Sequence, residues 1–216
     1  MLRRDSRARR YLICSSPLAV IAAGHLTAHL AEPVFGVWAW LPTVLVFWST
    51  LALLIAWGAG GAAIGAWLRR PRGNWRFPAL ALTTALIPLP ILLSNWQVLG
   101  SVWVWFPWLA FACINPWFEE GYWRGLLLDA SSEWPGWLCV PYSSLVFALS
   151  HPLIWGVNSI ANRHPAVLVS TFVMGLVWAM VYRRTRSLRW AILSHGLVDL
   201  FNLAIPVFMN LYTPGS

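Results

Sequence analysis

The 216-residue sequence contains no lysine, only seven acidic residues and three cysteines, and only 10% of its residues are charged. So small a charged fraction, beside 59% hydrophobic residues, excludes an ordinary soluble domain. The cysteines, Cys14, Cys113 and Cys139, are odd in number, lie in apolar surroundings and show no CxxC spacing. We therefore expect neither a disulfide framework nor a zinc site.

All 15 basic residues are arginines, and the net charge is +8. An even spread of this charge over a surface would favour nucleic acid as a partner. Instead 13 of the 15 arginines form three clusters between apolar runs, at residues 3–10, 69–76 and 183–189. Such clusters mark the cytoplasmic loops of membrane proteins. The sequence therefore predicts a multi-pass protein surrounded by the lipid bilayer of a cell membrane, with no nucleic-acid partner.

Seven apolar runs are candidates for membrane-spanning helices. They cover residues 11–31, 34–68, 77–96, 102–128, 136–155, 166–182 and 190–209. Seven spans would place all three arginine clusters on one side of the membrane. We therefore predict an all-α bundle of about seven transmembrane helices with a cytoplasmic N-terminus. It would comprise a basic cytoplasmic tail, residues 1–10, and a single transmembrane domain, residues 11–216, whose first helix is retained because no convincing cleavage site follows it.

Three charged side chains, Glu119, Glu120 and Arg124, interrupt the fourth apolar run. Each charge near the centre of a bilayer costs about 2.5 to 3.5 kcal/mol, so this stretch is expensive unless it has a function. Glu120 and Arg124 are four residues apart and share a helical face, which predicts an ion pair. Glu119 lies about 100° around the helix, so it points elsewhere. We expect Glu119, whose charge is less compensated, to be the general base.

Other polar residues lie inside later spans. His151 lies within the fifth run, and the seventh carries His195, Asp199 and Asn202 on one helical face. This face is expected to point into the bundle, because ionisable groups in a membrane avoid lipid. His164 lies in a polar loop and is expected to be solvated.

Two spacings in the first half of the chain favour simpler interpretations. His25 and His29 share a face near the outer end of the first span, which could bind a metal but is more typical of an interfacial position. Gly61 and Gly65 have the GxxxG spacing that lets two helices approach closely, and we predict helix packing there.

Three motifs together resemble the CPBP family, the CaaX prenyl protease type II and bacteriocin-processing (Abi) proteins, which are intramembrane glutamic endopeptidases. The motifs are Glu119-Glu120-xxx-Arg124, Phe147-xxx-His151 and His195-xxx-Asp199, within a core of residues 115–202. The resemblance implies a compact bacterial member in the cytoplasmic membrane. It also implies that Glu119 and His151 activate a water molecule, that Glu120 and Arg124 support them, and that His195 stabilises the oxyanion. No cofactor is implied.

The family most often has asparagine where this chain has Asp199. An ionised aspartate cannot donate a hydrogen bond to an oxyanion. Asp199 could be protonated, it could orient His195 and keep it charged, or Asn202 could supply the missing donor. We prefer the second interpretation, because an aspartate one turn from a histidine is well placed for it.

The depth of the residues in the membrane tests the site independently. Glu119 and His195 come to a similar depth, but His151 does not if its helix begins at Gly136. We therefore expect residues 134–142 to lie at the membrane interface, the helix to start near Ser143, and the membrane-embedded segment to be broken after Pro152.

The leading hypothesis is an intramembrane endopeptidase that cleaves a membrane-anchored protein or peptide near its C-terminus or within its membrane segment. Metal-dependent hydrolysis is an alternative, because His, Glu and Asp are suitable ligands, although no HExxH motif is present. A proton-coupled transporter and a non-catalytic bacteriocin-immunity or scaffold protein are the non-enzymatic alternatives. The substrate is open: a prenylated protein, a bacteriocin precursor or a C-terminal sorting tag.

Overall fold

The computed structural model describes residues 2–211, and their side chains from residue 7 onward. Part of the predicted basic tail, residues 1–10, and the last residues, 212–216, lie outside this description. The described residues form helices and connecting turns with no strand, so the predicted all-α class is confirmed. The α-helices are α1 (Leu2–Phe35), α2 (Trp40–Gly58), α3 (Gly60–Trp67), α4 (Arg76–Ala85), α5 (Leu89–Asn95), α6 (Val102–Glu120), α7 (Leu127–Ala130), α8 (Gly136–Ser150), α9 (Gly156–Asn158), α10 (Pro165–Thr185), α11 (Arg189–Phe201) and α12 (Ala204–Phe208).

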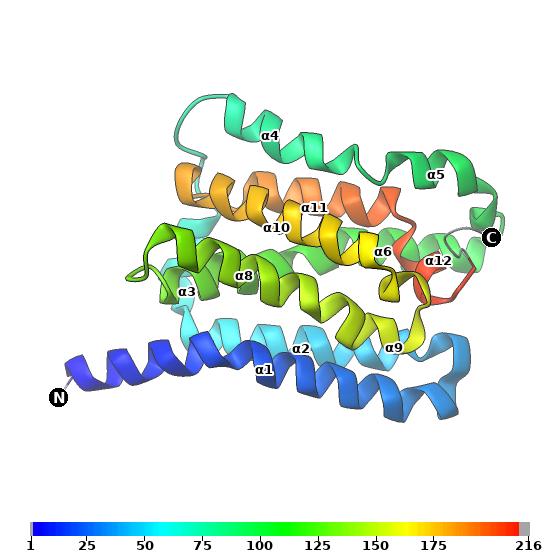
Figure 1. Cartoon of the computed structure of the whole chain (residues 1–216), viewed down its shortest axis with the longest axis horizontal. Coiled ribbons are helices and arrows are strands. Elements are labelled where there is room, and N and C mark those ends of the chain that lie inside the picture. Colours follow the sequence, from blue (N-terminus) through cyan, green and yellow to red (C-terminus); the bar gives the residue numbers. More distant parts are fainter. Residues whose placement is uncertain (1, 212–216) are drawn as a thin grey trace.

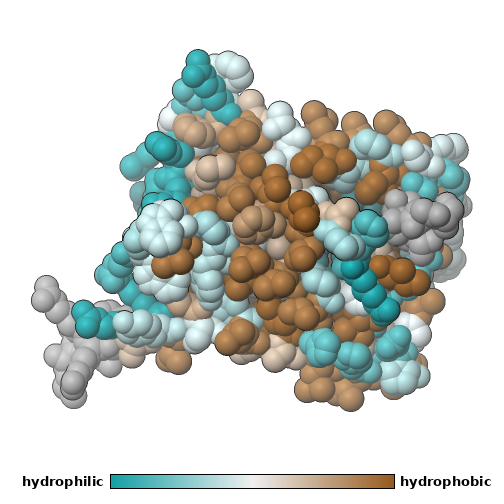
Figure 2. Space-filling model, in the orientation of Figure 1, coloured by the Kyte–Doolittle hydropathy of each residue, from teal (hydrophilic) through white to brown (hydrophobic). Residues whose placement is uncertain are grey.

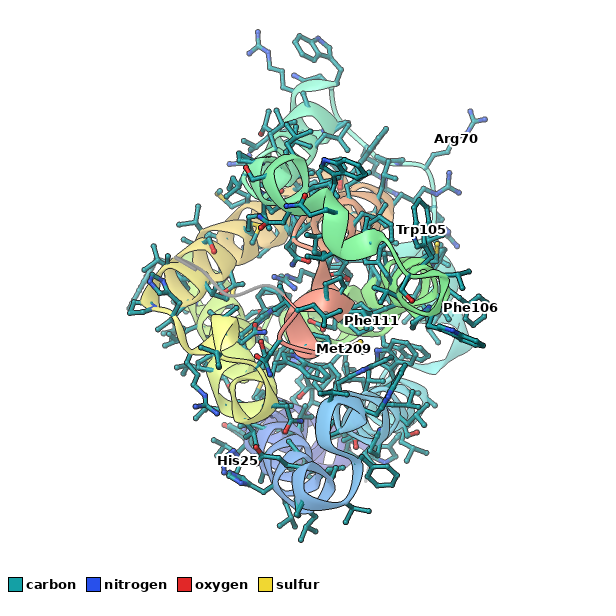
Figure 3. The ribbon with its side chains drawn as sticks, turned by 90° about the vertical axis from the view of Figure 1, so that its right-hand side faces the viewer. His25, Arg70, Trp105, Phe106, Phe111 and Met209 are labelled. Carbon is teal, nitrogen blue, oxygen red and sulfur yellow. The ribbon has the colours of Figure 1, made fainter. Side chains whose placement is uncertain are left out.

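Short turns of other geometry join several of these helices. The 3₁₀ turns are η1 (Gly36–Trp38), η2 (Trp96–Leu99) and η5 (Ala161–Arg163), and the π-helical turns are η3 (Gly121–Leu126) and η4 (His151–Trp155). The long helices run side by side (Figure 1): α1 and α2 form one side of the bundle, α4 and α5 the opposite side, and α6, α8, α10 and α11 lie between them. Figure 3 shows the same arrangement with most helices end-on.

Five helical segments of the described chain are long and apolar enough to cross a membrane. They are Arg7–Trp38, Trp40–Gly58, Arg76–Leu99, Gly136–Asn158 and Pro165–Thr185. The surface agrees with this, because a hydrophobic band crosses the middle of the face in Figure 2 and hydrophilic residues gather towards its two ends. The chain is a membrane protein. The predicted count of seven spans is not confirmed, because α6 and α11 are not among the five.

Two of the predicted apolar runs each form two helices rather than one. They are the longest run, 34–68, and the run richest in proline, 77–96. The predicted run 34–68 breaks between α2 and α3, where Gly60 has a positive φ of 73° that favours glycine. The run 77–96 breaks between α4 and α5, at Pro88, as its prolines predicted. The prediction of close helix packing at Gly61 and Gly65 is wrong, because a Cβ atom at either position would meet nothing within 4 Å.

The predicted start of the helix that precedes His151 is also wrong. Helix α8 begins at Gly136, not near Ser143. The shift is unnecessary because α7 and α8 meet at one turn, residues 131–135. At a rise of about 1.5 Å per residue, Glu119 lies roughly 17 Å before this turn and His151 roughly 22 Å after it. The two side chains therefore reach a comparable depth on antiparallel helices.

The prediction that the chain breaks directly after Pro152 is wrong. It continues through the π-turn η4 and the short helix α9 as far as Asn158. Pro152 has no backbone N–H and its ring crowds the carbonyl one turn earlier, which explains a widened turn rather than a regular α-helix at this point.

Candidate active site

The two π-turns of the described chain both lie at predicted site residues. Turn η3 follows directly after Glu119 and Glu120, and η4 starts at His151. Single π-turns inside α-helices change which side chains share a face, and they are frequent at functional sites. Turn η3 also packs closely against α3, because a Cβ atom on Gly125 would lie only 2.9 Å from the ring of Trp67.

Glu120 is the centre of a buried charged network. Its Oε1 accepts hydrogen bonds from Arg124 Nη1 at 2.9 Å and from His195 Nδ1 at 2.8 Å. The predicted ion pair of Glu120 and Arg124 is therefore present, and both side chains are completely buried. The Arg124 guanidinium also lies 4.0 Å from the ring centre of Phe147, in cation–π geometry.

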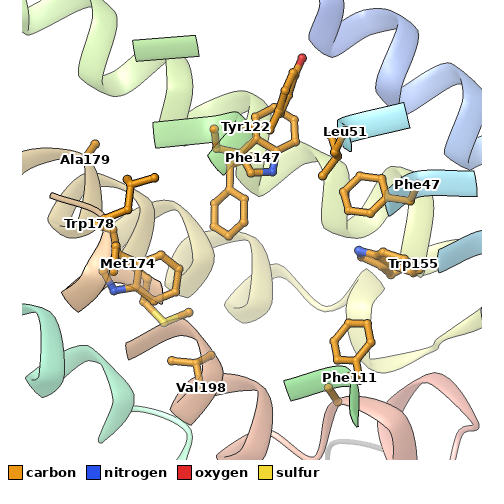
Figure 4. Packing of buried hydrophobic residues seen from close by; sticks show 14 of the residues in the cluster. Phe47, Leu51, Phe111, Tyr122, Phe147, Trp155, Met174, Trp178, Ala179 and Val198 are labelled. Carbon is orange, nitrogen blue, oxygen red and sulfur yellow. The ribbon is translucent and has the colours of Figure 1, made fainter. Parts of the chain in front are cut away.

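The ring of His195 is held from two sides. One nitrogen bonds to Glu120, and the ring face stacks on Trp178 with 4.8 Å between ring centres and 21° between planes. Trp178 is fixed in turn, because its Nε1 donates to Thr84 Oγ1 at 3.0 Å and to Ser194 Oγ at 3.2 Å. Figure 4 shows Trp178 and Phe147 among the buried hydrophobic side chains. The orientation of His195 is therefore set by packing as well as by charge.

Asp199 is held by a different side chain from the one predicted. Its Oδ2 accepts from Asn115 Nδ2 at 3.1 Å, and Asn115 Oδ1 accepts from Trp48 Nε1 at 2.9 Å. Its other oxygen lies 3.7 Å from His195 Nε2, which is within ion-pair distance but beyond a hydrogen bond. The hydrogen-bonding partner of His195 is thus Glu120, and the predicted orienting role of Asp199 stays a prediction.

Asn115 is a site residue that the sequence reasoning did not assign. It links α2, α6 and α11 through its two hydrogen bonds. The available signal was its position, because an asparagine in an apolar helix one turn before Glu119 faces the same side as that carboxylate.

Glu119 faces a small cavity inside the bundle. Its side chain is buried, and its Oε2 has no hydrogen-bond partner among the described residues. His151, His195, Asp199 and Asn202 line the same cavity, which leaves about 40 Å³ for the centres of water molecules. One water needs roughly 10 to 15 Å³ of such space. The cavity can therefore hold water beside a buried carboxylate that is in no ion pair with the described residues.

The hydrogen bond of His151 fixes its tautomer. His151 Nδ1 lies 3.0 Å from the backbone oxygen of Phe147. A carbonyl oxygen can only accept, so Nδ1 carries the proton, and in the neutral ring Nε2 is left as an acceptor. A histidine in this state can accept a hydrogen bond from a water molecule in the cavity that it lines.

A second, larger cavity of about 370 Å³ adjoins the first. It shares His151, His195, Asp199 and Asn202 with the small cavity, and the rest of its wall is mostly apolar. That wall comes mainly from the α4–α5 break and α10, through Ile87, Pro88, Ile91, Ala166, Val167 and Met174. The larger cavity therefore provides apolar space next to the polar groups.

Two polar residues of the loop before α10 also line the larger cavity, although neither was among the predicted site residues. Asn162 donates a hydrogen bond to Ser159 Oγ at 3.0 Å, and His164, predicted to be solvated, accepts from Ala166 N at 3.2 Å. No sequence pattern identified them, because their place at the cavity depends on how the loop folds back between α9 and α10.

The two histidines of α1 lie apart from the cavities, and the described residues offer no metal site. His25 and His29 stack edge to face, with 4.5 Å between ring centres, and do not line either cavity. Within residues 7–211, no group of three or more His, Cys, Asp and Glu side chains is arranged to hold a metal ion.

Comparison with known proteins places these motifs in a family. Residues 101–201 match the sequence model of a family described as type II CAAX prenyl endopeptidase Rce1-like. Among curated proteins and solved structures, none matches the chain significantly. The matched region contains all of the residues of the three motifs. Residues 101–201 therefore form a domain of the Rce1-like type II CAAX prenyl endopeptidase family, whose members are membrane proteases.

Proposed function

We propose that the chain is an intramembrane endopeptidase that hydrolyses a peptide bond by means of a water molecule activated by Glu119. The observation that carries this proposal is the position of Glu119, a buried carboxylate outside any ion pair of the described residues, in the wall of a water-sized cavity that His151 also lines. A buried carboxylate without a counter-ion is costly, and active sites are where such a cost is retained.

The proposed reaction proceeds without a covalent intermediate. Glu119 accepts a proton from a water molecule that also donates a hydrogen bond to His151 Nε2, and the water oxygen attacks the carbonyl carbon of the substrate. The proton held by Glu119 then passes to the amide nitrogen as the carbon–nitrogen bond breaks. The products are a carboxylic acid and an amine.

Glu120 and Arg124 have a supporting role in this proposal. Because Glu120 bonds to His195 Nδ1, it holds the ring and favours its protonated form, which leaves Nε2–H available to the oxyanion. Asn202 supplies a second donor through its amide Nδ2, because it lines the same cavity. Asp199 is a second anionic neighbour of His195, 3.7 Å from its Nε2, and adds to the effect of Glu120.

The substrate proposed is the membrane-anchored part of a protein or peptide. An apolar cavity of about 370 Å³ that opens onto the reactive groups suits an apolar segment or lipid-modified end better than a soluble peptide. A prenylated protein, a bacteriocin precursor and a C-terminal sorting tag all have this character. The bacterial cytoplasmic membrane is the proposed location.

The test is cleavage of such candidate substrates during co-expression with the wild-type chain or with Glu119→Gln. This change keeps the shape of the side chain and removes its capacity as a base. We expect cleavage to fall by roughly 100- to 10,000-fold. Cleavage at the wild-type rate would overturn the mechanism.

Two alternatives are separated by the same assay. Loss of activity with a strong chelator, restored by a divalent metal, would point to metal-dependent hydrolysis. A wild-type chain that cleaves none of the candidates, yet still protects cells from a bacteriocin when Glu119 is replaced by glutamine, would point to a non-catalytic immunity protein.

A further inference from the structure

The arginine-rich end of the bundle contains a second cavity, remote from the site of hydrolysis. It measures about 270 Å³ and lies between α3, the following turn, α7 and α10. Four arginines and one aspartate are the charged residues of its wall, which gives it a net charge of +3. The wall consists of Ala63, Ala66, Trp67, Arg69, Arg70, Arg72, Asp129, Tyr182 and Arg186.

Backbone hydrogen bonds fix the turns that carry these arginines. Arg72 N donates to Thr185 O at 2.9 Å, and Leu188 N donates to Trp67 O at 2.8 Å. The hydroxyl of Ser187 donates to the backbone oxygen of Arg69 at 2.8 Å. The two turns are therefore tied to each other through main-chain atoms, and the cavity is part of the folded structure rather than a gap between mobile side chains.

The one acidic residue of this cavity is already satisfied. Asp129 accepts hydrogen bonds from Trp67 Nε1 at 2.9 Å and from the Tyr182 hydroxyl at 2.9 Å, and Arg186 lies 3.7 Å away. The side chains of Arg69, Arg70 and Arg72 are exposed and show no hydrogen bond or ion pair with the described residues. Three positive charges thus remain available to an anion.

Apolar surface adjoins this charged cavity. Helix α3 presents Gly61 and Gly65 to open space, and its Ala63 and Ala66 form part of the cavity wall. A helix with so little side-chain volume leaves a shallow strip beside the arginines. A neighbouring cavity of about 200 Å³, which contains Arg9 and Arg10, shares Ala63, Trp67 and Asp129 with the first.

We propose that this cavity binds the phosphate-bearing headgroup of an anionic phospholipid, with an acyl chain lying along α3. Basic pockets between membrane helices on the cytoplasmic side are suited to such headgroups. Arginine binds phosphate oxygens through paired N–H groups, and the three available guanidiniums converge on one cavity. Figure 3 places Arg70 at the outer edge of the bundle, where a lipid can reach it. A free phosphate ion offers the same oxygen atoms but has no chain to cover α3.

The experiment measures lipid binding to the full chain purified in neutral detergent, by native mass spectrometry. The probes are phosphatidylglycerol, phosphatidylcholine and inorganic phosphate. We expect retained phosphatidylglycerol on the wild type, with phosphatidylcholine and phosphate much weaker. The triple variant Arg69→Gln, Arg70→Gln and Arg72→Gln should bind phosphatidylglycerol roughly 100-fold more weakly. This triple variant changes only side chains, so the main-chain hydrogen bonds that fix the two turns are kept.

The matched control removes the same charge outside the cavity, through Arg7→Gln, Arg76→Gln and Arg184→Gln. This control should bind phosphatidylglycerol within about fivefold of the wild type. An equal loss in both triple variants would overturn the proposed site in favour of general charge attraction. Inorganic phosphate binding as tightly as phosphatidylglycerol would overturn the lipid as ligand. A cavity variant that binds like the wild type would overturn both.

Discussion

Two neighbouring carboxylates in one helix have opposite surroundings. Glu120 accepts hydrogen bonds from Arg124 and His195. Phe147 packs on the first of these partners and Trp178 on the second. Glu119 faces a cavity, and one of its oxygens has no partner. Both side chains are buried, so burial alone does not separate them. Each carboxylate has one oxygen without a hydrogen-bond partner. The difference lies in ion pairing and in space: Glu120 is held by Arg124 and His195, whereas Glu119 is in no ion pair with the described residues and lines a cavity that can hold water.

The largest expected effect distinguishes these two glutamates by stability. Glu120→Ala leaves the buried Arg124 without its counter-ion, so the free energy of unfolding should fall by about 3 to 5 kcal/mol. Glu119→Ala removes a carboxylate that is in no ion pair with the described residues, and should change stability by less than about 1 kcal/mol. Thermal unfolding in detergent measures both. Equal losses from the two variants would contradict the division between them.

The second prediction concerns the cavity side of the site. Asn202→Ala should reduce the rate of substrate cleavage by roughly 100- to 1,000-fold, because one donor to the oxyanion is lost. Asp199→Asn should leave most of the activity, since Glu120 still holds His195. The two rates, compared at saturating substrate, decide which residue completes the oxyanion site. Full activity in Asn202→Ala would assign that role elsewhere.

A third prediction tests the packing around the charged network. A Cβ atom on Gly175 would lie 3.2 Å from Arg124 Nη2 and 3.1 Å from Ser144 Cβ. Gly175→Ala should therefore cost about 1 to 3 kcal/mol of stability through crowding. Gly65→Ala is the matched control, because it meets open space, and alanine there should be neutral or stabilising by up to about 1 kcal/mol. A harmless Gly175→Ala would show that the guanidinium has room to move.

The smallest effect is expected at Asn115, which links Asp199 to Trp48. Asn115→Ala removes hydrogen bonds to Asp199 and Trp48, each worth about 0.5 to 1.5 kcal/mol. Stability should fall moderately, and cleavage should fall by less than for Asn202→Ala. Asn115→Asp should be worse than alanine, because two carboxylates would then face each other. Chemical denaturation and the cleavage rate together check this order.

Spacing in the sequence was sufficient wherever the contact lay within one helix. The Glu120–Arg124 pair follows from a four-residue separation, and the divergence of Glu119 from Glu120 follows from the helical angle between neighbours. Pro88 also marked a real break. Spacing failed where a second element was needed: Gly61 and Gly65 have the spacing for close packing, but no helix lies against them.

The partner of His195 shows why part of the site could not be predicted. Asp199 is its neighbour one turn along the same helix, and was the natural choice from the sequence. The hydrogen bond instead comes from Glu120, 75 residues earlier in the chain. The role of Asn115, which reaches Asp199 and Trp48 on two other helices, was hidden for the same reason.

The sequence by itself determined that this protein is helical, lies in a membrane and concentrates its chemistry in a few charged residues within apolar runs. Composition and helical periodicity are local properties, and they follow from residue type and spacing alone. Only the tertiary structure decided that Glu119 lines a water-sized cavity outside any ion pair, while Glu120 is held by Arg124 and His195. That outcome depends on which side chains of other helices come within hydrogen-bonding distance, and the packing of the whole bundle sets those distances.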